Sequence, residues 1–240
     1  MNQYLTTRVN DGNYIYIGEN MITLHHLNNS RSQRILWMLE ELELEYEIKN
    51  YQRDPLTNLA PEALKKVHPL GKSPVITDGD ITVAESGAII DYLARRYGAD
   101  KMLPAVQSEA YREYNYWLHF AEGSLMPPMV AKLVFDKVRE NAKPFFIKII
   151  ANKIADKVMS AYFGPNISAN MAFIESHLAS HQWFAGETLT GADIQMSFPL
   201  EASASRGISG YPNIARYVQR IHARDAYKRA LIRGGKYAYA

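Results

Sequence analysis

The segment around Pro74 combines residue types that could hold a small peptide. Proline has no amide hydrogen, so it begins a strand or sits at an edge, and a Ser73–Pro74 bond costs little to hold in the cis form. We predict a cis bond, which would turn the N–H and C=O groups of Ser73 outward at a strand end. Outward backbone of this kind pairs with an extended peptide as an added strand. The alternative interpretation is a plain turn before a strand.

Glu85 and Ser86 come after the two β-rich runs that follow the proline, and they stand at the start of an apolar helical pattern. The first amides of a helix have no partner within the helix, and the helix dipole favours negative charge at that end. With Ser86 as the expected N-cap, this helix start predicts a site for a carboxylate. Lys72 could meet a second anionic group, and a solvated loop lysine is the alternative.

Ser30 and Ser32 supply hydroxyl groups just after the first predicted strand. A serine hydroxyl is no base near neutral pH, but it can donate a hydrogen bond to a sulfur anion and so favour the charged form. A helix cap is the alternative role for Ser30. The chain has no cysteine, which excludes disulfides and every mechanism that uses a thiolate of the protein itself.

His177 and His181 stand four residues apart, but no acidic or cysteine ligand is patterned with them. We expect surface histidines and no metal site.

These residues require elements to position them, and residues 21–98 alternate between strand and helix patterns in the order βαβαββα. The step Asp78-Gly79-Asp80 between two β-rich runs predicts a hairpin. Right-handed crossovers for parallel neighbours make this order a thioredoxin-like α/β domain. Strands are expected at 22–27, 46–49, 75–77 and 81–83, and helices at about 32–42, 61–67 and 86–97.

Strand signals disappear after the connection 99–107, so residues 108–240 are predicted to form an all-helical domain. Met126-Pro127-Pro128 should break or kink its first helix. Thr190 and Asp193 form a capping box at a later helix start. Arg229, Arg233 and Lys236 are expected to form a solvated C-terminal end. Residues 1–20 are a separate arm or an upstream extension before Met21.

The composition of the chain also limits the classes of binding partner that we expect. The 27 basic and 25 acidic residues among 240 give a formal charge of +2, which predicts neither nucleic acid nor an acidic membrane as a partner. No apolar run reaches the roughly 18 residues of a membrane span, and residues 1–20 lack the pattern of a secretory signal. We expect a cytoplasmic protein.

Four strings in this order resemble the soluble glutathione S-transferases, within a bacterial and fungal serine-type branch that uses no catalytic cysteine. They are Leu39–Leu42, His68–Pro74, Ala84–Gly87 and Ala121–Pro127. The resemblance runs from about Met21 to the C-terminus.

The resemblance implies an extended glutathione along the first domain. Its cysteinyl part would pair with the backbone of Ser73 beside Pro74, and its glycine carboxylate would meet Lys72. Glu85 would hold the ammonium group and Ser86 the γ-glutamyl carboxylate. Glutathione is then a co-substrate, with no tightly bound cofactor.

Ser30 aligns best with the family's catalytic position, where its hydroxyl would donate to the glutathione thiolate, with Asn28, Asn29 and Arg31 as auxiliaries. The electrophile should sit between this loop and the first helices of the second domain. A helical stripe supplies candidate wall residues, although core packing is the alternative for it: Tyr111, Asn115, Leu118 and Glu122.

The expected function is conjugation of glutathione to small hydrophobic electrophiles in detoxification, with reduction of organic hydroperoxides as a second activity. The chain's lack of cysteine excludes dithiol exchange. The resemblance also implies a homodimer. A non-catalytic glutathione-binding or regulatory protein on the same fold is the alternative, because a fold does not fix an activity.

Overall fold

A computed structural model describes residues 6–8, 14–16, 21–57, 59–99, 101–207 and 209–240. Within the N-terminal arm, strand β1 (Thr6–Arg8) pairs antiparallel with β2 (Tyr14–Tyr16). The remainder of the arm lies outside the described residues.

The first domain is built on a mixed sheet in the order β4-β3-β5-β6. Its strands are β3 (Ile22–Leu27), β4 (Tyr46–Tyr51), β5 (Val75–Asp78) and β6 (Ile81–Ala84). β3 runs parallel to β4, and β5 runs antiparallel to both of its neighbours. The antiparallel pairing of β5 with β6 is the one predicted from the Asp-Gly step. Gly79 takes a positive φ of 60° in the hairpin between β5 and β6, a conformation that glycine adopts without steric cost.

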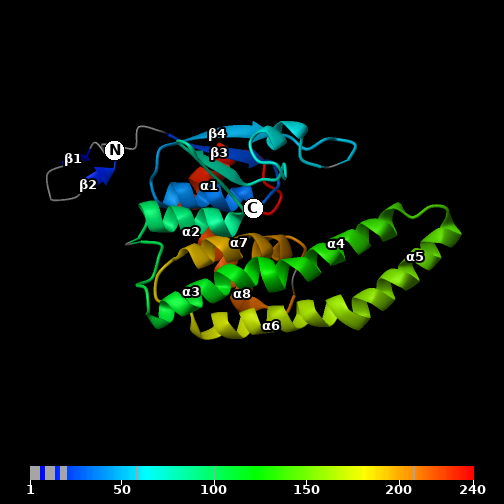
Figure 1. The fold of residues 1–240 in the computed structure, drawn as a ribbon. Helices are drawn as coiled ribbons and strands as arrows, with labels where there is room; N and C mark the ends of the chain where they lie inside the picture. Colours follow the sequence, from blue (N-terminus) through cyan, green and yellow to red (C-terminus); the bar gives the residue numbers. More distant parts are fainter. Residues whose placement is uncertain (1–5, 9–13, 17–20, 58, 100, 208) are drawn as a thin grey trace.

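Helices α1 (Ser32–Glu41) and α2 (Ser86–Tyr97) lie between this sheet and the second domain (Figure 1). The element predicted as a helix at 61–67 is a 3₁₀ helix, η1 (Glu62–Lys66). Only five residues separate Pro61 from the end of this element, too few to sustain an α-helix without packing support. With this change the predicted βαβαββα order is confirmed.

The second domain consists of helices joined by loops in its described residues. The first long helix does not break at the two prolines: a π-helical turn carries it into the next helix, whose first turn holds Pro127 and Pro128, where proline is best tolerated. The elements are α3 (Glu109–Phe120), η2 (Ala121–Leu125), α4 (Met126–Asn141), α5 (Phe145–Val158), η3 (Met159–Phe163), α6 (Gly164–Ser180), α7 (Gly191–Ala204), α8 (Pro212–His222) and α9 (Asp225–Gly234).

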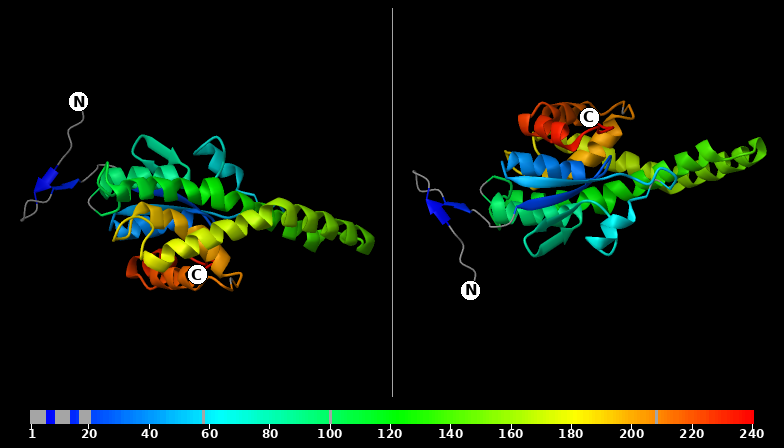
Figure 2. Two further views of the ribbon diagram at one scale, coloured as in Figure 1. Left: turned by 90° about the horizontal axis from the view of Figure 1, so that it is seen from below. Right: turned by 90° about the horizontal axis from the view of Figure 1, so that it is seen from above.

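The hairpin formed by α4 and α5 projects well beyond the body of the molecule (Figure 2). Large apolar side chains on it are exposed, and Phe145 keeps 78% of its accessible surface. No helix in the described part of the chain is both long and apolar enough to cross a membrane.

Helix α7 is the centre of the molecule, and its residues from Gly191 to Ala202 are buried against α1, α2 and α3. A Cβ at Gly191 would come within 2.6 Å of the Ile90 side chain, so the absence of a side chain lets α7 approach α2 closely. The predicted capping box is present. Asp193 accepts from the backbone N–H groups of Thr190 and Phe184, each at 2.9 Å.

Helix α9 packs against α1. Arg229 and Arg233 are exposed, as a solvated C-terminal end predicts, but both also bind the first domain. Arg229 donates to the Glu40 carboxylate at 2.7 Å, and Arg233 donates to the Tyr46 carbonyl oxygen at 2.9 Å. Glu40 is only 8% exposed, and a buried carboxylate requires such partners. Helix α9, near the C-terminus, therefore binds helix α1, which begins two residues after Ser30.

Candidate active site

The Ser73–Pro74 peptide bond is cis, as predicted. The Ser73 hydroxyl donates to the carbonyl oxygen of His25 at 2.8 Å and accepts from the N–H of Leu27 at 3.2 Å. These two bonds tie the side chain of Ser73 to β3. Any contact of Ser73 with a ligand is thus left to its backbone.

Helix α2 begins one residue earlier than an N-cap at Ser86 would require. Glu85 is the N-cap residue, with a φ of 71°, and Ser86 is the first helical residue. The Ser86 hydroxyl accepts a hydrogen bond from Arg34 at 3.2 Å and so does not cap the helix. The first helical N–H to bond back is that of Ile89, to the Glu85 carbonyl oxygen. The amides before it are available to an anion, as the sequence predicts.

All five predicted binding residues, Lys72, Ser73, Pro74, Glu85 and Ser86, line one cavity of about 250 Å³. Its remaining walls include Arg31 and Glu122. An exposed lysine and a helix start both line this cavity, so it offers two positions for negative charge. An extended peptide with a carboxylate at each end matches that arrangement.

Ser30 lines an adjoining cavity of about 360 Å³, which shares Arg31, Lys72 and Ser73 with the first. One side of it is apolar and belongs to the second domain, with Met126, Met129, Val130, Leu133, Phe198 and Tyr239. A nucleophile held in the first cavity would therefore face an apolar space next to the hydroxyl of Ser30.

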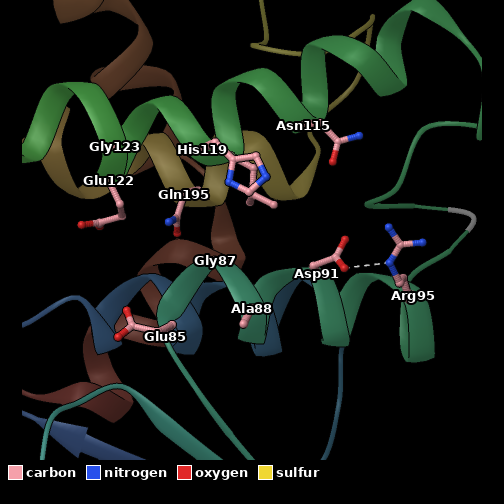
Figure 3. Close-up of a pocket in the computed structure, with 11 residues that line it drawn as sticks. Glu85, Gly87, Ala88, Asp91, Arg95, Asn115, His119, Glu122, Gly123 and Gln195 are labelled. Atoms are coloured by element: carbon pink, nitrogen blue, oxygen red, sulfur yellow. Dashed lines mark hydrogen bonds and ion pairs between the residues drawn. The ribbon is translucent and has the colours of Figure 1, made fainter. Parts of the chain in front are cut away.

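The predicted wall residues for the electrophile do not gather at this second cavity. Asn115, Leu118 and Glu122 line a third cavity of about 600 Å³ between α2 and α3 (Figure 3). The Tyr111 hydroxyl accepts from Arg95 at 2.8 Å instead of lining any of the three.

The apolar residues that face Ser30 come from the next helix. Met126, Met129, Val130 and Leu133 recur at helical spacing on α4, a signal that could have identified them. The π-helical turn re-aims α4 relative to α3, and this rotation is not visible in the sequence.

Ser30 belongs to a buried chain of hydrogen bonds. Its hydroxyl oxygen accepts from the N–H of Ser32 at 3.2 Å and lies 2.9 Å from the Ser32 hydroxyl. Ser32 in turn lies 2.8 Å from Nδ1 of His26. Burial lowers the pKa of His26 to about 4, so the imidazole is neutral at pH 7. The oxygen of the Ser30 hydroxyl thus serves as a local acceptor for the N–H of Ser32. The Ser32 hydroxyl also donates to the carbonyl oxygen of Leu27 at 3.1 Å, and either hydroxyl can be the donor in the contact between the two serines.

An ion cluster beneath the site was missed by sequence reasoning. Glu122 accepts from Nε of Arg31 at 2.9 Å and from Nη1 of Arg34 at 3.0 Å. Burial alone would raise the pKa of Glu122, but the charges and hydrogen bonds of the two arginines outweigh it, and the pKa is lowered.

Arg34 is fully buried at the contact of the two domains, where its Nη1 also donates to Gln195 at 2.6 Å. The position of this arginine directly before Ile35, at the start of the predicted amphipathic helix, is the signal that could have revealed it.

The two histidines of the predicted surface pair differ in their surroundings. His177 is half-buried and stacks on His181 with ring centroids 4.3 Å apart, while His181 is exposed. Among the described residues, no group of three or more potential ligands could hold a metal ion.

Comparison with known proteins accounts for this architecture. The family described as "Glutathione S-transferase, N-terminal domain" matches residues 19–95, and "Glutathione S-transferase, C-terminal domain" matches residues 156–225. Over 209 residues the chain is 43% identical to glutathione S-transferase 3 of Schizosaccharomyces pombe, with 86% of this chain and 85% of the relative covered. Glutathione S-transferase 1 of Saccharomyces cerevisiae is 35% identical, with 86% and 92% covered.

A crystal structure of a glutathione S-transferase from Actinobacillus pleuropneumoniae superimposes with a TM-score of 0.75 at 36% identity, covering 91% of this chain and 94% of that one. The matches extend across both domains and exceed 30% identity over most of the chain. This protein therefore belongs to the glutathione S-transferase family.

Proposed function

We propose that this chain is a serine-type glutathione transferase that conjugates the glutathione thiolate to small hydrophobic electrophiles, with reduction of organic hydroperoxides as a second activity. The observation that carries the proposal is the position of the Ser30 hydroxyl on an apolar cavity that adjoins the one lined by Lys72, Ser73 and Glu85. The family relatives at 43% and 35% identity are named as glutathione S-transferases and support the same activity.

Glutathione would lie extended through the smaller cavity. Its γ-glutamyl carboxylate would meet the free amides at the start of α2 beside Ser86, and its ammonium group would meet Glu85. The backbone of Ser73 would pair with the cysteinyl residue, and Lys72 would meet the glycine carboxylate. This orientation directs the sulfur toward Ser30 and the apolar cavity beyond it.

The hydroxyl of Ser30 would stabilise the thiolate. If donation lowers a thiol pKa from about 8.5 by about two units, the thiolate fraction at pH 7 rises from about 3% to about three quarters. The thiolate then attacks the electrophilic atom, and the leaving group departs with its electron pair. With a hydroperoxide, the thiolate attacks the distal oxygen, the O–O bond breaks, and the alkoxide leaves and is protonated to the alcohol. A second glutathione then condenses with the resulting sulfenic acid to give glutathione disulfide and water.

Replacement of the donor tests this proposal. Ser30→Ala should raise the pKa of the bound thiol by about two units and lower turnover at pH 7 by roughly 25-fold, while glutathione affinity changes less. The thiol pKa is measured by ultraviolet absorbance of the thiolate, turnover with a chlorinated nitroaromatic, and affinity by calorimetry. Ser197→Ala on α7 is the matched control, because that buried hydroxyl bonds only within its helix.

An unchanged thiol pKa and rate in Ser30→Ala would remove Ser30 from the mechanism. Glutathione binding without turnover of any electrophile or hydroperoxide, in the unmodified chain, would instead favour the non-catalytic alternative.

We place the electrophile in the cavity that Ser30 lines. The stripe of Asn115, Leu118 and Glu122 remains a second proposed wall, since these residues line a cavity of their own. We also propose a homodimer, supported by the family and by the exposed apolar surface of α4 and α5, with sedimentation velocity as its test. Domain boundaries at 98 and 108 and a cytoplasmic compartment complete the proposal.

A further inference from the structure

We propose that the electrophile used by this protein carries a negative charge, and that Arg206 selects for it. The inference rests on the proposed function. Its basis is the charge of the cavity next to Ser30, which is lined by cationic side chains and by no carboxylate. The four cationic residues are Arg31, Arg53, Lys72 and Arg206.

Three of these four cationic side chains already have an interaction or a proposed ligand. Arg31 is paired with Glu122 through two hydrogen bonds of its Nε, at 2.9 and 3.0 Å. Lys72 is assigned to the glycine carboxylate of glutathione. Arg53 donates to the Asn29 carbonyl oxygen at 3.4 Å, which places it beside the loop that carries Ser30.

Arg206 remains as a cation without an anionic partner. It follows the C-terminal end of α7, with its guanidinium 6.0 Å from the ring of Tyr239, and its residue surface is exposed. Within the part of the chain that the structure describes, no carboxylate lies within ion-pair distance of it. A cation without such a partner at a cavity wall attracts anionic ligands.

The cavity has a polarity along α7 that matches an amphipathic anion. Phe198 and Ala202 lie four residues apart on α7, and Arg206 stands in the turn after the helix. All three line the cavity, whose α7 side therefore carries an aromatic ring and a cation. Met129 and Leu133 of α4 line the same cavity. An aromatic or aliphatic body would lie against these side chains, with its anionic group at Arg206 and its reactive atom toward Ser30.

A matched pair of substrates tests the inference: 4-chloro-3-nitrobenzoate and its neutral analogue 4-chloro-3-nitrobenzamide. In both, the thiolate attacks the ring carbon that bears chlorine, a C–S bond forms, and chloride leaves with the electron pair of the C–Cl bond. The kcat/KM of each is divided by its uncatalysed rate constant with glutathione, which removes the difference in intrinsic reactivity. The corrected kcat/KM for the benzoate is expected to be about five times that for the benzamide at low salt.

Arg206→Gln should bring the ratio down to about one, and Arg206→Lys should retain part of it. Added salt should lower the ratio in the unmodified protein, because the ion pair lies at an exposed position. Arg216→Gln, an exposed arginine on α8, is the matched control and should leave the ratio as it is.

Turnover of both substrates with a ratio near one, or a ratio that Arg206→Gln does not change, would overturn the inference and leave the transferase activity intact. Absence of turnover with both substrates, in a protein that turns over other electrophiles, would also overturn the inference. Absence of turnover with every electrophile and hydroperoxide would overturn the proposed function itself. The two failures are therefore distinguishable in one experiment.

Discussion

Glu85 holds a backbone conformation that only glycine adopts at low cost. Its φ of 71° with a ψ of 124° lies outside the regions open to residues with a Cβ. Such a conformation costs on the order of 1–3 kcal/mol and persists where the surrounding structure imposes it. Here it brings a carboxylate to the rim of the cavity, beside the free amides of α2.

Glu85→Gly should therefore raise the free energy of unfolding by about 1 kcal/mol and weaken glutathione binding by about tenfold or more. Glu85→Ala should weaken binding equally but gain no stability, because alanine keeps the strain. Urea unfolding and calorimetric titration measure the two effects. Equal stability of the glycine and alanine variants would show that the backbone of Glu85 is not strained.

His26 makes stability depend on pH, because it is neutral in the folded protein. Its folded pKa of about 4 lies below the ordinary 6.5, so between these values the unfolded chain binds the extra proton. The neutral His26 imidazole therefore contributes fully to the free energy of unfolding above pH 6.5. This contribution, roughly 3 kcal/mol, is lost as the pH falls toward 4.

His26→Asn should accordingly flatten the loss of unfolding free energy between pH 6.5 and pH 4, measured by urea unfolding across this range. The comparison of variants is needed because burial raises the pKa of Asp193 to about 6, which gives an opposite trend over part of the same window. His119→Asn, at an exposed site, is the control. Equal slopes in wild type and His26→Asn would contradict the assignment.

At the scale of elements, the start of α7 depends on one carboxylate. Asp193 is fully buried and accepts from the N–H groups of Phe184 and Thr190 and from the hydroxyl of Tyr217. A buried donor that loses its acceptor costs about 1–3 kcal/mol.

Asp193→Ala leaves at least two such amides, so it should lower the free energy of unfolding by roughly 3 kcal/mol or more. Thr190→Val removes one cap acceptor, and we expect a loss of about 1 kcal/mol. The midpoints and slopes of urea unfolding measure both. A smaller loss for Asp193→Ala than for Thr190→Val would show that the carboxylate is not the principal cap.

At the scale of the whole molecule, the C-terminal helix holds the helix that starts at the site. Burial would raise the pKa of Glu40, but hydrogen bonds from Tyr46, Arg229 and Arg233 outweigh it and keep the pKa below its usual value. Replacing both arginines leaves this buried carboxylate with Tyr46 and without a cation.

The double variant Arg229→Gln, Arg233→Gln should lower the midpoint of urea unfolding, and the difference from wild type should shrink as salt is added. Lys228→Gln is the control, since Lys228 pairs with the exposed Asp225 in the same helix. An unchanged midpoint in the double variant would mean that apolar packing alone joins α9 to α1.

Local features of this protein could be predicted from the sequence because their causes lie within a few residues. Proline chemistry set the cis bond at Ser73–Pro74, Asp-Gly set the β5–β6 hairpin, and the spacing of Thr190 and Asp193 set the capping box. The strings around these features also identified the family, and five predicted binding residues do line one cavity.

Only the tertiary structure decided which distant segments meet. Arg34 and Glu122 stand far apart in the chain, and their pairing follows from the packing of α1 against the second domain. The apolar wall facing Ser30 comes from α4 because a π-helical turn redirects the helix after α3. Such contacts depend on how whole elements pack, and the periodicity of a single helix carries no information about the orientation of its neighbour.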